Sequence, residues 1–377
     1  MHRPIAIIAD DFTGAAEIAG ISMRYGLTAE VFNHRVMPSA ADIIVLNTDS
    51  RSMNRENASM ATRRAMEQLN ALAPQWIYKK TDSVLRGYVL DELQLQVELT
   101  GAHKLLFIPA NPSLLRTIHD GQYLIAGQPI SETAFAGDPE FPANRSSVLD
   151  MMGATNGLVR VRKHPDEIGH EKIVVGEASS KADIEAWVMR IDETWTMAGA
   201  ADFFNTLLAR QFQQTPAVSP ALQLPQLYLS GTSYAERKSW IREKDRHIGC
   251  VCYLPVPAVV PAAWILYLQN MLDRQHKAIL AIDEHVAATL TAPDIREWSA
   301  CVLQTALEKT GVSEIFIEGG STAAAVFEKL QVTRLIAVDE LSRGVVRMQA
   351  GDRFFIVKPG SYAMPEQMEA LYAHPAP

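Results

Sequence analysis

The sequence contains little cysteine. Its 377 residues include only Cys250, Cys252 and Cys301, too few and too poorly spaced for a disulfide framework or a structural zinc site. We interpret them as small buried hydrophobic residues. The N-terminus also lacks a basic region followed by an apolar stretch and a cleavage site, so no signal peptide is expected. Together these absences favour a reducing cytoplasm.

An excess of positive charge is also missing. The chain has 35 Lys and Arg residues against 43 Asp and Glu, which gives a formal net charge of −8. General affinity for nucleic acid requires a surplus of cations to neutralise phosphates. Nucleic acid is therefore a disfavoured partner, although a local cluster of cations can still bind a small anion.

One apolar run has the length of a membrane span but not its continuity. Residues 248–272 carry no charge and are rich in Val, Leu and Trp, as a transmembrane helix would be. Pro255, Pro257 and Pro261 divide the run, and proline interrupts both helical and strand hydrogen bonding. We expect a short strand near residues 251–254, a loop and a helix starting around Pro261, and no membrane span.

Two common nucleotide-binding signatures are absent. No GxxxxGK followed by Ser or Thr occurs, so the chain is not a P-loop protein by sequence. No GxGxxG follows a strand either, because Gly14 and Gly20 are too far apart. A dinucleotide-dependent dehydrogenase is therefore disfavoured.

Strand-like and helix-like segments alternate along the whole chain. This pattern predicts an α/β fold with largely parallel sheets covered by helices, and the length exceeds what one hydrophobic core usually supports. We expect two α/β domains, residues 1–215 and 226–377, joined by a proline-containing linker at about 213–225 and facing a central cleft. In the first domain we expect strands near residues 5–9, 29–32, 43–46, 76–79, 105–108 and 173–175, and a hairpin of 123–125 with 129–130.

Paired carboxylates end the first expected strand. Asp10 and Asp11 follow residues 5–9 and precede a helix, and in an open α/β sheet this position faces a ligand crevice. Thr13 is the expected N-cap of the helix, with Glu17 near its positive end. One of the two acids could cap the helix as well, but a cap does not need two adjacent acids. A ligand or a metal is the stronger interpretation.

A second polar turn combines charges of both signs with hydroxyl groups. Lys80, Thr81, Asp82 and Ser83 leave the strand near residues 76–79, Arg86 follows shortly after, and Arg51 follows another strand. Arginine pairs with carboxylates and Asp accepts hydrogen bonds from hydroxyls, as recognition of a small polyhydroxy acid requires. A solvated surface loop would explain Lys79 or Arg86 alone. Three such loops at strand ends favour a binding site.

Glycine and hydroxyl residues mark turns in the second half. In such a turn the glycine backbone lets a phosphate approach closely, and the N-terminus of the following helix adds a favourable dipole. Each could be only a tight turn with a capping residue, but their repetition suggests a nucleotide phosphate site. The turns are Ser230-Gly231-Thr232-Ser233, Gly319-Gly320-Ser321-Thr322 and Lys358-Pro359-Gly360.

In combination these motifs resemble the four-carbon acid sugar kinase family. They occur in the family's order and cover nearly the whole chain. The nucleotide half departs from the usual pattern: Ser321 stands where the family has Asp, and the turns that begin at Gly231 and at Lys358 also differ from the family's. The motifs are Ala9-Asp10-Asp11-Phe12-Thr13-Gly14-Ala15, Lys80-Thr81-Asp82-Ser83 with Arg86-Gly87, Pro109-Ala110-Asn111-Pro112 with Asp120-Gly121, and Gly319-Gly320-Ser321-Thr322.

The resemblance implies a sugar-acid-binding N-terminal domain and a nucleotide-binding C-terminal domain. It implies ATP-dependent phosphorylation, with Mg²⁺, of the terminal hydroxyl of D-threonate or D-erythronate, or alternatively of 3-oxo-tetronate. The implied substrate residues are Asp10, Asp11, Arg51, Lys80, Thr81, Asp82, Ser83 and Arg86. The implied ATP residues are Ser230, Gly231, Thr232, Ser233, Gly319, Gly320, Ser321, Thr322 and Gly360.

Several points stay open on the sequence. Asp11 or Asp82 would accept the proton of the substrate hydroxyl, and no metal ligands can be named. A lyase acting on the same hydroxy acids, or a sugar-acid sensor without turnover, remains an alternative. The expected partners are a small sugar acid and ATP, without nucleic acid or membrane, and a homodimer is left open.

Overall fold

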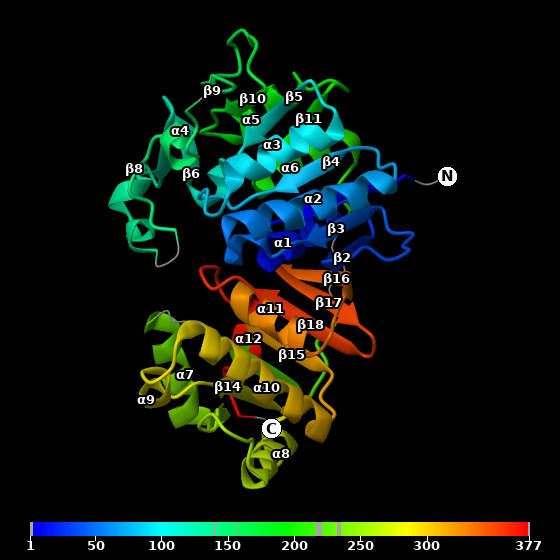
Figure 1. The fold of residues 1–377 in the computed structure, drawn as a ribbon. Coiled ribbons are helices and arrows are strands. Elements are labelled where there is room, and N and C mark those ends of the chain that lie inside the picture. Colours follow the sequence, from blue (N-terminus) through cyan, green and yellow to red (C-terminus); the bar gives the residue numbers. More distant parts are fainter. Residues whose placement is uncertain (1–2, 139–140, 156, 216–220, 232–234, 376–377) are drawn as a thin grey trace. The chain divides into compact units, whose positions relative to one another are not determined.

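The computed structural model divides into two compact units, Met1–Pro216 and Ala217–Pro377 (Figure 1). It describes residues 3–138, 141–155, 157–215, 221–231 and 235–375. The division falls within the segment expected as a linker, residues 213–225. The roles of the two units and their facing arrangement remain predictions.

The first unit contains a sheet whose neighbouring strands all run parallel. This confirms the expected α/β class with a largely parallel sheet. Two of its strands were not expected: β11, in the middle of the sheet, and the edge strand β9. The strand order is β2 (Ala29–Asn33), β3 (Ile43–Asn47), β1 (Ile5–Ala9), β4 (Ile77–Lys80), β11 (Trp195–Gly199), β5 (Lys104–Ile108), β10 (Ile173–Gly176) and β9 (Val159–Arg162).

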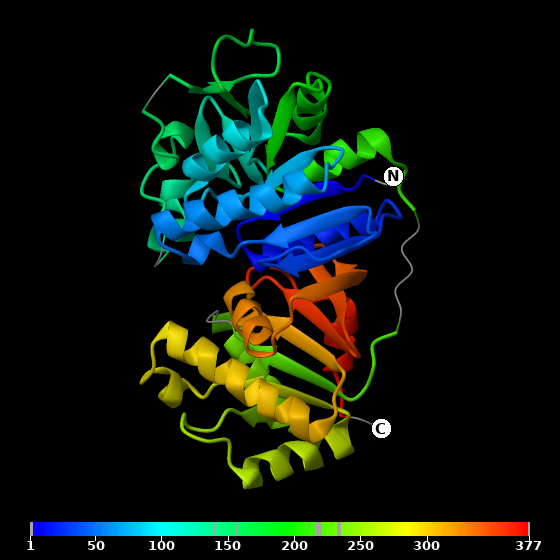
Figure 2. The same ribbon diagram turned by 45° about the vertical axis from the view of Figure 1, so that its right-hand side comes forward.

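Helices cover both faces of this sheet. α2 (Arg55–Ala71) packs beside α3 (Val89–Thr100) on one face, whereas α6 (Ala201–Gln211) packs against α1 (Phe12–Met23) and α5 (Lys181–Val188) on the other (Figures 1 and 2). The chain therefore leaves β1 toward one face and the neighbouring strand β3 toward the other. Such a reversal opens a crevice outside the carboxyl ends of the strands, between β1 and β3.

Helix α1 begins one residue after Asp11, which is its N-cap. The Asp11 Oδ1 atom accepts a hydrogen bond from the Gly14 N–H at 2.9 Å, and Thr13 donates its hydroxyl to Asp11 Oδ2 at 2.5 Å. The expectation of an N-cap at Thr13 was therefore wrong. The carboxylate fills the cap because it accepts from the free N–H groups and also favours the positive end of the helix.

An antiparallel sheet interrupts the α/β alternation of the first unit. It contains β6 (Arg116–His119), β7 (Gln122–Ile125) and β8 (Gln128–Pro129). β7 and β8 confirm the hairpin expected from residues 123–130, and β6 adds a strand to it. We call residues 109–147, which contain this sheet, the excursion.

The second unit has a sheet with five parallel strands followed by an antiparallel edge. The order is β13 (Val251–Tyr253), β14 (Lys277–Ala281), β12 (Gln226–Ser230), β15 (Glu314–Glu318), β18 (Arg353–Lys358), β17 (Val345–Ala350) and β16 (Arg334–Ser342). Its helices are α7 (Ala235–Ile248), α8 (Ala262–Gln275), α9 (Glu284–Ala287), α10 (Ala292–Thr310), α11 (Gly320–Lys329) and α12 (Glu366–Leu371).

The proline-divided apolar run folds as expected, with β13 in its first part and α8 in its last. Pro261 is the N-cap of α8. Among the described residues, no helix is both long and apolar enough to span a bilayer.

Cys250 directly precedes β13, Cys252 lies within it, and both are buried, whereas Cys301 on α10 is only half-buried. Burial raises the pKa of the Cys250 thiol to about 11 and that of Cys252 to about 12.

A prediction concerns Gly199, where β11 meets the site described below. Its φ is +154°, a Cβ there would lie 2.1 Å from the Ile108 carbonyl oxygen, and its own carbonyl accepts from the Thr81 N–H at 3.1 Å. Since β-sheet backbone cannot yield as a side chain can, we expect Gly199→Ala to lower the free energy of unfolding by more than about 2 kcal/mol. Urea unfolding followed by tryptophan fluorescence measures this.

Gly137→Ala is the matched control, because a Cβ at Gly137 meets nothing within 4 Å. An unchanged unfolding midpoint in both variants would show that the strand has room for a side chain at Gly199.

Candidate functional site

Three polar loops of the first unit meet at one edge of the sheet. They follow β3, β1 and β4, which are direct neighbours in that order, so the parallel strands bring their carboxyl ends together. The loops carry Arg51, Asp10 with Asp11, and Lys80 to Arg86. The proximity that the sequence predicted for these three loops is present in the structure.

Arg51 lies at the centre of the cluster and pairs with carboxylates of the protein. Its Nε and Nη2 atoms donate to Asp10 Oδ2 at 3.0 and 2.9 Å. Its Nη1 atom donates to Asp11 Oδ2 at 3.0 Å and lies 3.7 Å from Asp82 Oδ1. The side chain is 14% exposed. Arg51 thus holds the loops after β1 and β4 against the loop after β3, in which it lies.

Asp82 is the second centre of charge pairing. Arg86 donates from Nε to Oδ2 and from Nη2 to Oδ1, both at 2.9 Å, in the bidentate geometry typical of strong Arg–carboxylate pairs. The N–H groups of Val84 and Arg86 also donate to Oδ2. Burial by itself raises the pKa of Asp82, but Arg86 and Arg51 outweigh it and hold that pKa well below its usual range.

The two adjacent acids differ in their electrostatics. Asp10 is 3% exposed, and burial raises its pKa despite the attraction of Arg51 and Lys79. For Asp11 burial acts in the same direction, but Arg51, Lys80 and the hydrogen bonds from Thr13 and Gly14 lower the pKa on balance. Asp11 is therefore a firmly ionised carboxylate, and its side chain is 17% exposed.

The two lysines of the β4 end have different surroundings. Lys79 is buried and its Nζ lies 3.0 Å from Glu92 Oε2, within the sheet's helix-covered interior. Lys80 Nζ lies 3.4 Å from Glu17 Oε2 and donates to the Thr81 carbonyl at 3.1 Å. Gly14 makes room for it, because a Cβ there would lie 3.2 Å from Lys80 Nζ and 2.7 Å from Asp11 Oδ1.

Residues of the excursion complete the cluster, and the sequence did not single them out. Arg116 donates to the Ser83 hydroxyl, Tyr123 donates its hydroxyl to the Ser83 carbonyl, and Arg86 Nη1 donates to Asp138 Oδ2 at 3.3 Å. The sequence marks this segment only as a whole: residues 109–142 form a long stretch punctuated by Pro and Gly, and such a stretch inside a domain is often functional. It pointed to a segment and not to side chains.

Two buried polar atoms of this cluster have no hydrogen-bond partner among the described residues: Asp10 Oδ1 and Thr81 Oγ1. Buried polar groups are rarely left unpaired. Together with the Ser83 hydroxyl they make the edge of β1 and β4 suitable for a ligand rich in hydroxyl groups.

The glycine turns of the second unit also meet at one sheet edge. β12, β15 and β18 are neighbours, the Gly231 N–H donates to the Glu318 carbonyl, and the Gly319 N–H donates to the Lys358 carbonyl, both at 2.9 Å. Ser230, Gly231, Gly319 to Thr322 and Gly360 are thus brought to one edge. Thr232 and Ser233 of the predicted set lie outside the described residues.

Glycine is required in this edge for steric reasons. A Cβ at Gly231 would lie 1.9 Å from Thr322 Oγ1, and Gly319 has a φ of +107°. Gly319 caps α11 without a side-chain hydrogen bond, and the first N–H groups of a helix have no partner within the helix itself. These features fit a phosphate group.

A buried ion pair lies directly behind the turn. Lys358 Nζ donates to Glu318 Oε1 at 2.8 Å, Tyr228 donates its hydroxyl to Glu318 Oε2, and Arg237 Nε lies 3.4 Å from Oε1. Burial lowers the pKa of Lys358, and Glu318 opposes this only partly. Glu318 is therefore engaged in holding the strand ends together.

A protein-held magnesium ion does not fit this edge. Both oxygens of Glu318 are already engaged, and no group of three or more His, Cys, Asp or Glu residues in the described part of the chain could hold a metal ion. Magnesium in such sites is commonly carried by the nucleotide phosphates with few protein ligands.

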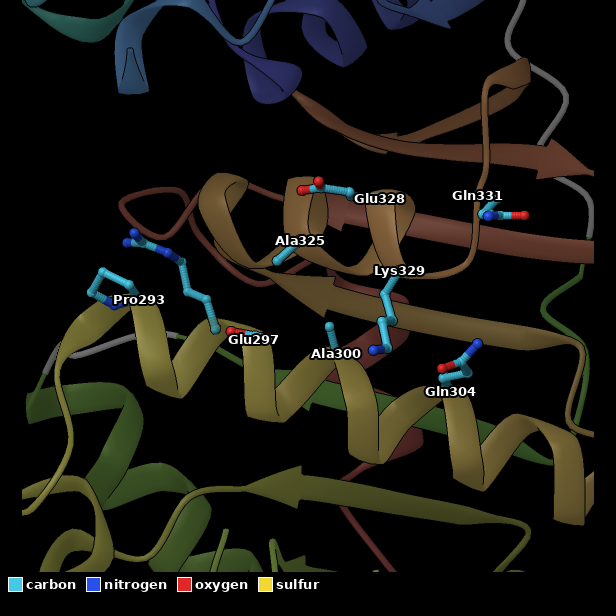
Figure 3. A pocket seen from close by; sticks show the side chains of 9 residues that line it. Pro293, Glu297, Ala300, Gln304, Ala325, Glu328, Lys329 and Gln331 are labelled. Atoms are coloured by element: carbon cyan, nitrogen blue, oxygen red, sulfur yellow. The ribbon is translucent and has the colours of Figure 1, made fainter. Parts of the chain in front are cut away.

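A surface pocket of the second unit lies apart from the predicted residues. It measures about 680 Å³ and is lined by side chains of α10 and α11, among them Arg296, Glu297, Glu328 and Lys329 (Figure 3). No described member of the predicted nucleotide set lines it. Its mixed charges identify no ligand.

Comparison with known proteins gives the following matches. A family model described as a sugar-binding N-terminal domain matches residues 5–207. A D-threonate kinase of Bordetella bronchiseptica is 24% identical over 90% of this chain and 88% of its own length. A D-threonate kinase of Salmonella typhimurium is 32% identical over 57% of this chain and 56% of its own.

Shorter matches extend the set of named activities. A D-erythronate kinase of Heliobacterium modesticaldum aligns over 40% of the chain, and a 3-oxo-tetronate kinase of Pectobacterium atrosepticum over 39%. A solved protein from Salmonella typhimurium LT2 has the same fold, with a TM-score of 0.81 at 18% identity over 98% of each chain.

The pairing of Asp82 yields a prediction on stability. Asp82→Ala leaves Arg86 and Arg51 without a carboxylate, and we expect it to lower the free energy of unfolding at pH 7 by roughly 3 kcal/mol. Because the pKa of Asp82 is depressed in the folded state, the carboxylate stabilises the fold at pH values above its ordinary pKa of 3.8, and this stabilisation is lost as pH falls below that value. The gap between wild type and variant should therefore shrink as pH falls below about 4.

Urea unfolding across that pH range measures both effects. Asp192→Ala, at an exposed turn where Asp192 accepts from Thr194, is the control. A gap that stays constant with pH would contradict the assigned pairing.

Proposed function

The chain belongs to the four-carbon acid sugar kinase family, and we propose that it transfers the terminal phosphate of ATP to the 4-hydroxyl of a four-carbon sugar acid, D-threonate or D-erythronate. The observation that carries the proposal is the convergence of Asp11, Arg51 and Lys80 to Ser83 on one crevice. The matched D-threonate kinase extends over nearly the whole chain, which favours D-threonate.

On the substrate side, each polar group has a use in binding a polyol chain. The unpartnered Asp10 Oδ1 and Thr81 Oγ1 atoms and the Ser83 hydroxyl can exchange hydrogen bonds with the hydroxyl groups of the sugar acid. Arg51 and Arg86 hold the carboxylates of Asp10, Asp11 and Asp82 in place. The crevice is thereby organised before the substrate arrives.

On the nucleotide side, we propose that the phosphates of ATP bind the turns around Gly231 and Gly319. The N–H groups at the start of α11 and the hydroxyls of Ser230, Ser321 and Thr322 are the donors, and Gly360 completes the edge. We propose that Mg²⁺ comes with the nucleotide, and no step below depends on it. Use of ATP agrees with the cytoplasmic location that we propose.

Phosphoryl transfer needs positioning and charge neutralisation more than covalent work by the protein. Of the two acids that the sequence left open, Asp11 is the more accessible, with 17% of its side chain exposed against 7% for Asp82. Arg86 holds both oxygens of Asp82 in a bidentate pair, whereas Asp11 meets an arginine, Arg51, through Oδ2 alone. We therefore propose that Asp11 orients the attacking hydroxyl and accepts its proton, while Asp82 fixes the two arginines.

The proposed activity has a direct test. Purified protein with ATP and Mg²⁺ should release ADP in the presence of D-threonate or D-erythronate, as measured by a coupled ADP assay, and the product should carry phosphate on its terminal hydroxyl by mass spectrometry and NMR. Turnover of 3-oxo-tetronate instead would favour the alternative suggested by the shorter matches.

Two outcomes would refute a kinase. Consumption of the sugar acid without ADP would indicate a lyase, and binding of D-threonate without any turnover would indicate a sensor.

The assignment of Asp11 predicts a specific kinetic defect. We expect Asp11→Asn to lower the single-turnover rate of phosphorylation by roughly 10²-fold or more, because general-base assistance contributes about this factor. The Asn side chain can still accept from the Gly14 N–H, so the helix cap and the fold should persist. Quenched-flow measurement with saturating ATP gives the rate, and circular dichroism checks the fold.

Asp192→Asn is the surface control for this experiment. A fall of less than about threefold in the Asp11 variant would remove Asp11 from the chemical step.

A further inference from the structure

We infer that Arg116 binds the carboxylate of the sugar acid, a role that the sequence alone would give to Arg51 or Arg86. The inference rests on the proposed function, since it concerns the acid group of the same substrate. It follows from the ion pairs that the other positively charged side chains of the crevice already form with carboxylates of the protein.

The cations nearest the predicted substrate residues are all paired within the protein. Arg51 contacts Asp10 and Asp11, Arg86 contacts Asp82 and Asp138, and Lys80 lies beside Glu17. A substrate carboxylate placed among these groups would meet several protein carboxylates with no uncommitted positive charge. Like charges at such short range raise the free energy of the complex, so a further cation is needed.

Arg116 is a cation of the right kind at this place. Among the described residues it forms no ion pair, and its guanidinium donates from Nη1 to the Ser83 hydroxyl. The same guanidinium lies over the ring of Phe135, 5.6 Å from its centroid. A guanidinium presents several donors in a fixed fork that matches a carboxylate, and within the described part of the chain only Nη1 is engaged, with Ser83. The remaining donors are left for a ligand.

The excursion holds Arg116 in position before any ligand binds. The Asn111 N–H donates to the Arg116 carbonyl at 2.7 Å and the Arg116 N–H donates to the Asn111 carbonyl at 3.2 Å. Arg116 also begins β6, in register with Ile125 of β7. Tyr123, also on β7, ties the backbone of Ser83 to the excursion. The guanidinium and the substrate-binding turn are therefore fixed to each other.

This placement orients the substrate along the crevice. The carboxylate lies at the Ser83 and Arg116 end, and the hydroxyl chain extends toward the loop of Asp11. Arg116 thereby makes the site selective for an acid over the neutral polyol of the same length, because only the acid satisfies the uncommitted cation.

Kinetics of Arg116→Ala, Arg116→Lys and wild type test the inference, with D-threonate and its neutral analogue D-threitol as substrates. We expect the alanine variant to raise KM for D-threonate about 10- to 100-fold, as expected from loss of a charge-assisted hydrogen bond. KM for ATP should change less than about twofold, and the preference for D-threonate over D-threitol should fall. The lysine variant should recover part of the loss.

Arg145→Ala is the matched control, since Arg145 is an exposed arginine of the same excursion. Thermal unfolding checks that the alanine variant is still folded. The lysine variant keeps the positive charge, so it separates loss of charge from a loosening of the excursion. An unchanged KM for D-threonate in Arg116→Ala, or an equal rise in KM for ATP, would overturn the inference.

Calorimetric titration of D-threonate separates this inference from the proposed function. If wild type shows no ADP release but binds D-threonate, and Arg116→Ala does not, the kinase proposal fails while the role of Arg116 is upheld. If wild type binds no D-threonate at all, both fail. If both proteins bind equally, only the role of Arg116 fails.

Discussion

The pairing of Arg51 with Asp10 and Asp11 is the interaction on which the first unit's crevice depends. Three strands end side by side, and two of their loops carry carboxylates that would repel one another at this distance. One guanidinium from the third loop reaches all of them. Because Arg51 already pairs with these carboxylates, the proposed sugar acid would need another cation for its acid group, which is the role that we propose for Arg116.

Much of this arrangement could be predicted from the sequence because it follows from strand order. Polar residues after buried strands share an edge whenever the strands run parallel, so Asp11, Arg51 and Lys80 had to be close. Partners are harder to predict than positions: Arg51 and Asp10 are 41 residues apart, and the sequence shows their charges without showing which pair. Strand β11 escaped prediction because Thr196, Ala198 and Gly199 give it only a weak apolar pattern. Arg116 escaped because it lies in an irregular segment.

The two units solve a similar problem with different chemistry. In each, neighbouring parallel strands bring polar turns to one edge of the sheet, and a buried lysine–glutamate pair lies behind the edge: Lys79 with Glu92 in one, Lys358 with Glu318 in the other. The first unit lines its edge with charged side chains. The second uses backbone N–H groups and positions where no Cβ fits, such as Gly231. The former suits a ligand recognised by its hydroxyls, the latter one recognised by its phosphates.

The excursion that carries Arg116 contains a separate antiparallel sheet and lies between β5 and α4 (Val148–Met151). It contacts the crevice at Ser83 and Arg86, whereas Asp11, the proposed base, follows a strand of the parallel sheet. In our proposal, recognition of the acid and support of the chemistry are therefore encoded in separate parts of the chain. A protein built this way can diverge toward a new acid by changing one insert, while its catalytic framework is inherited intact.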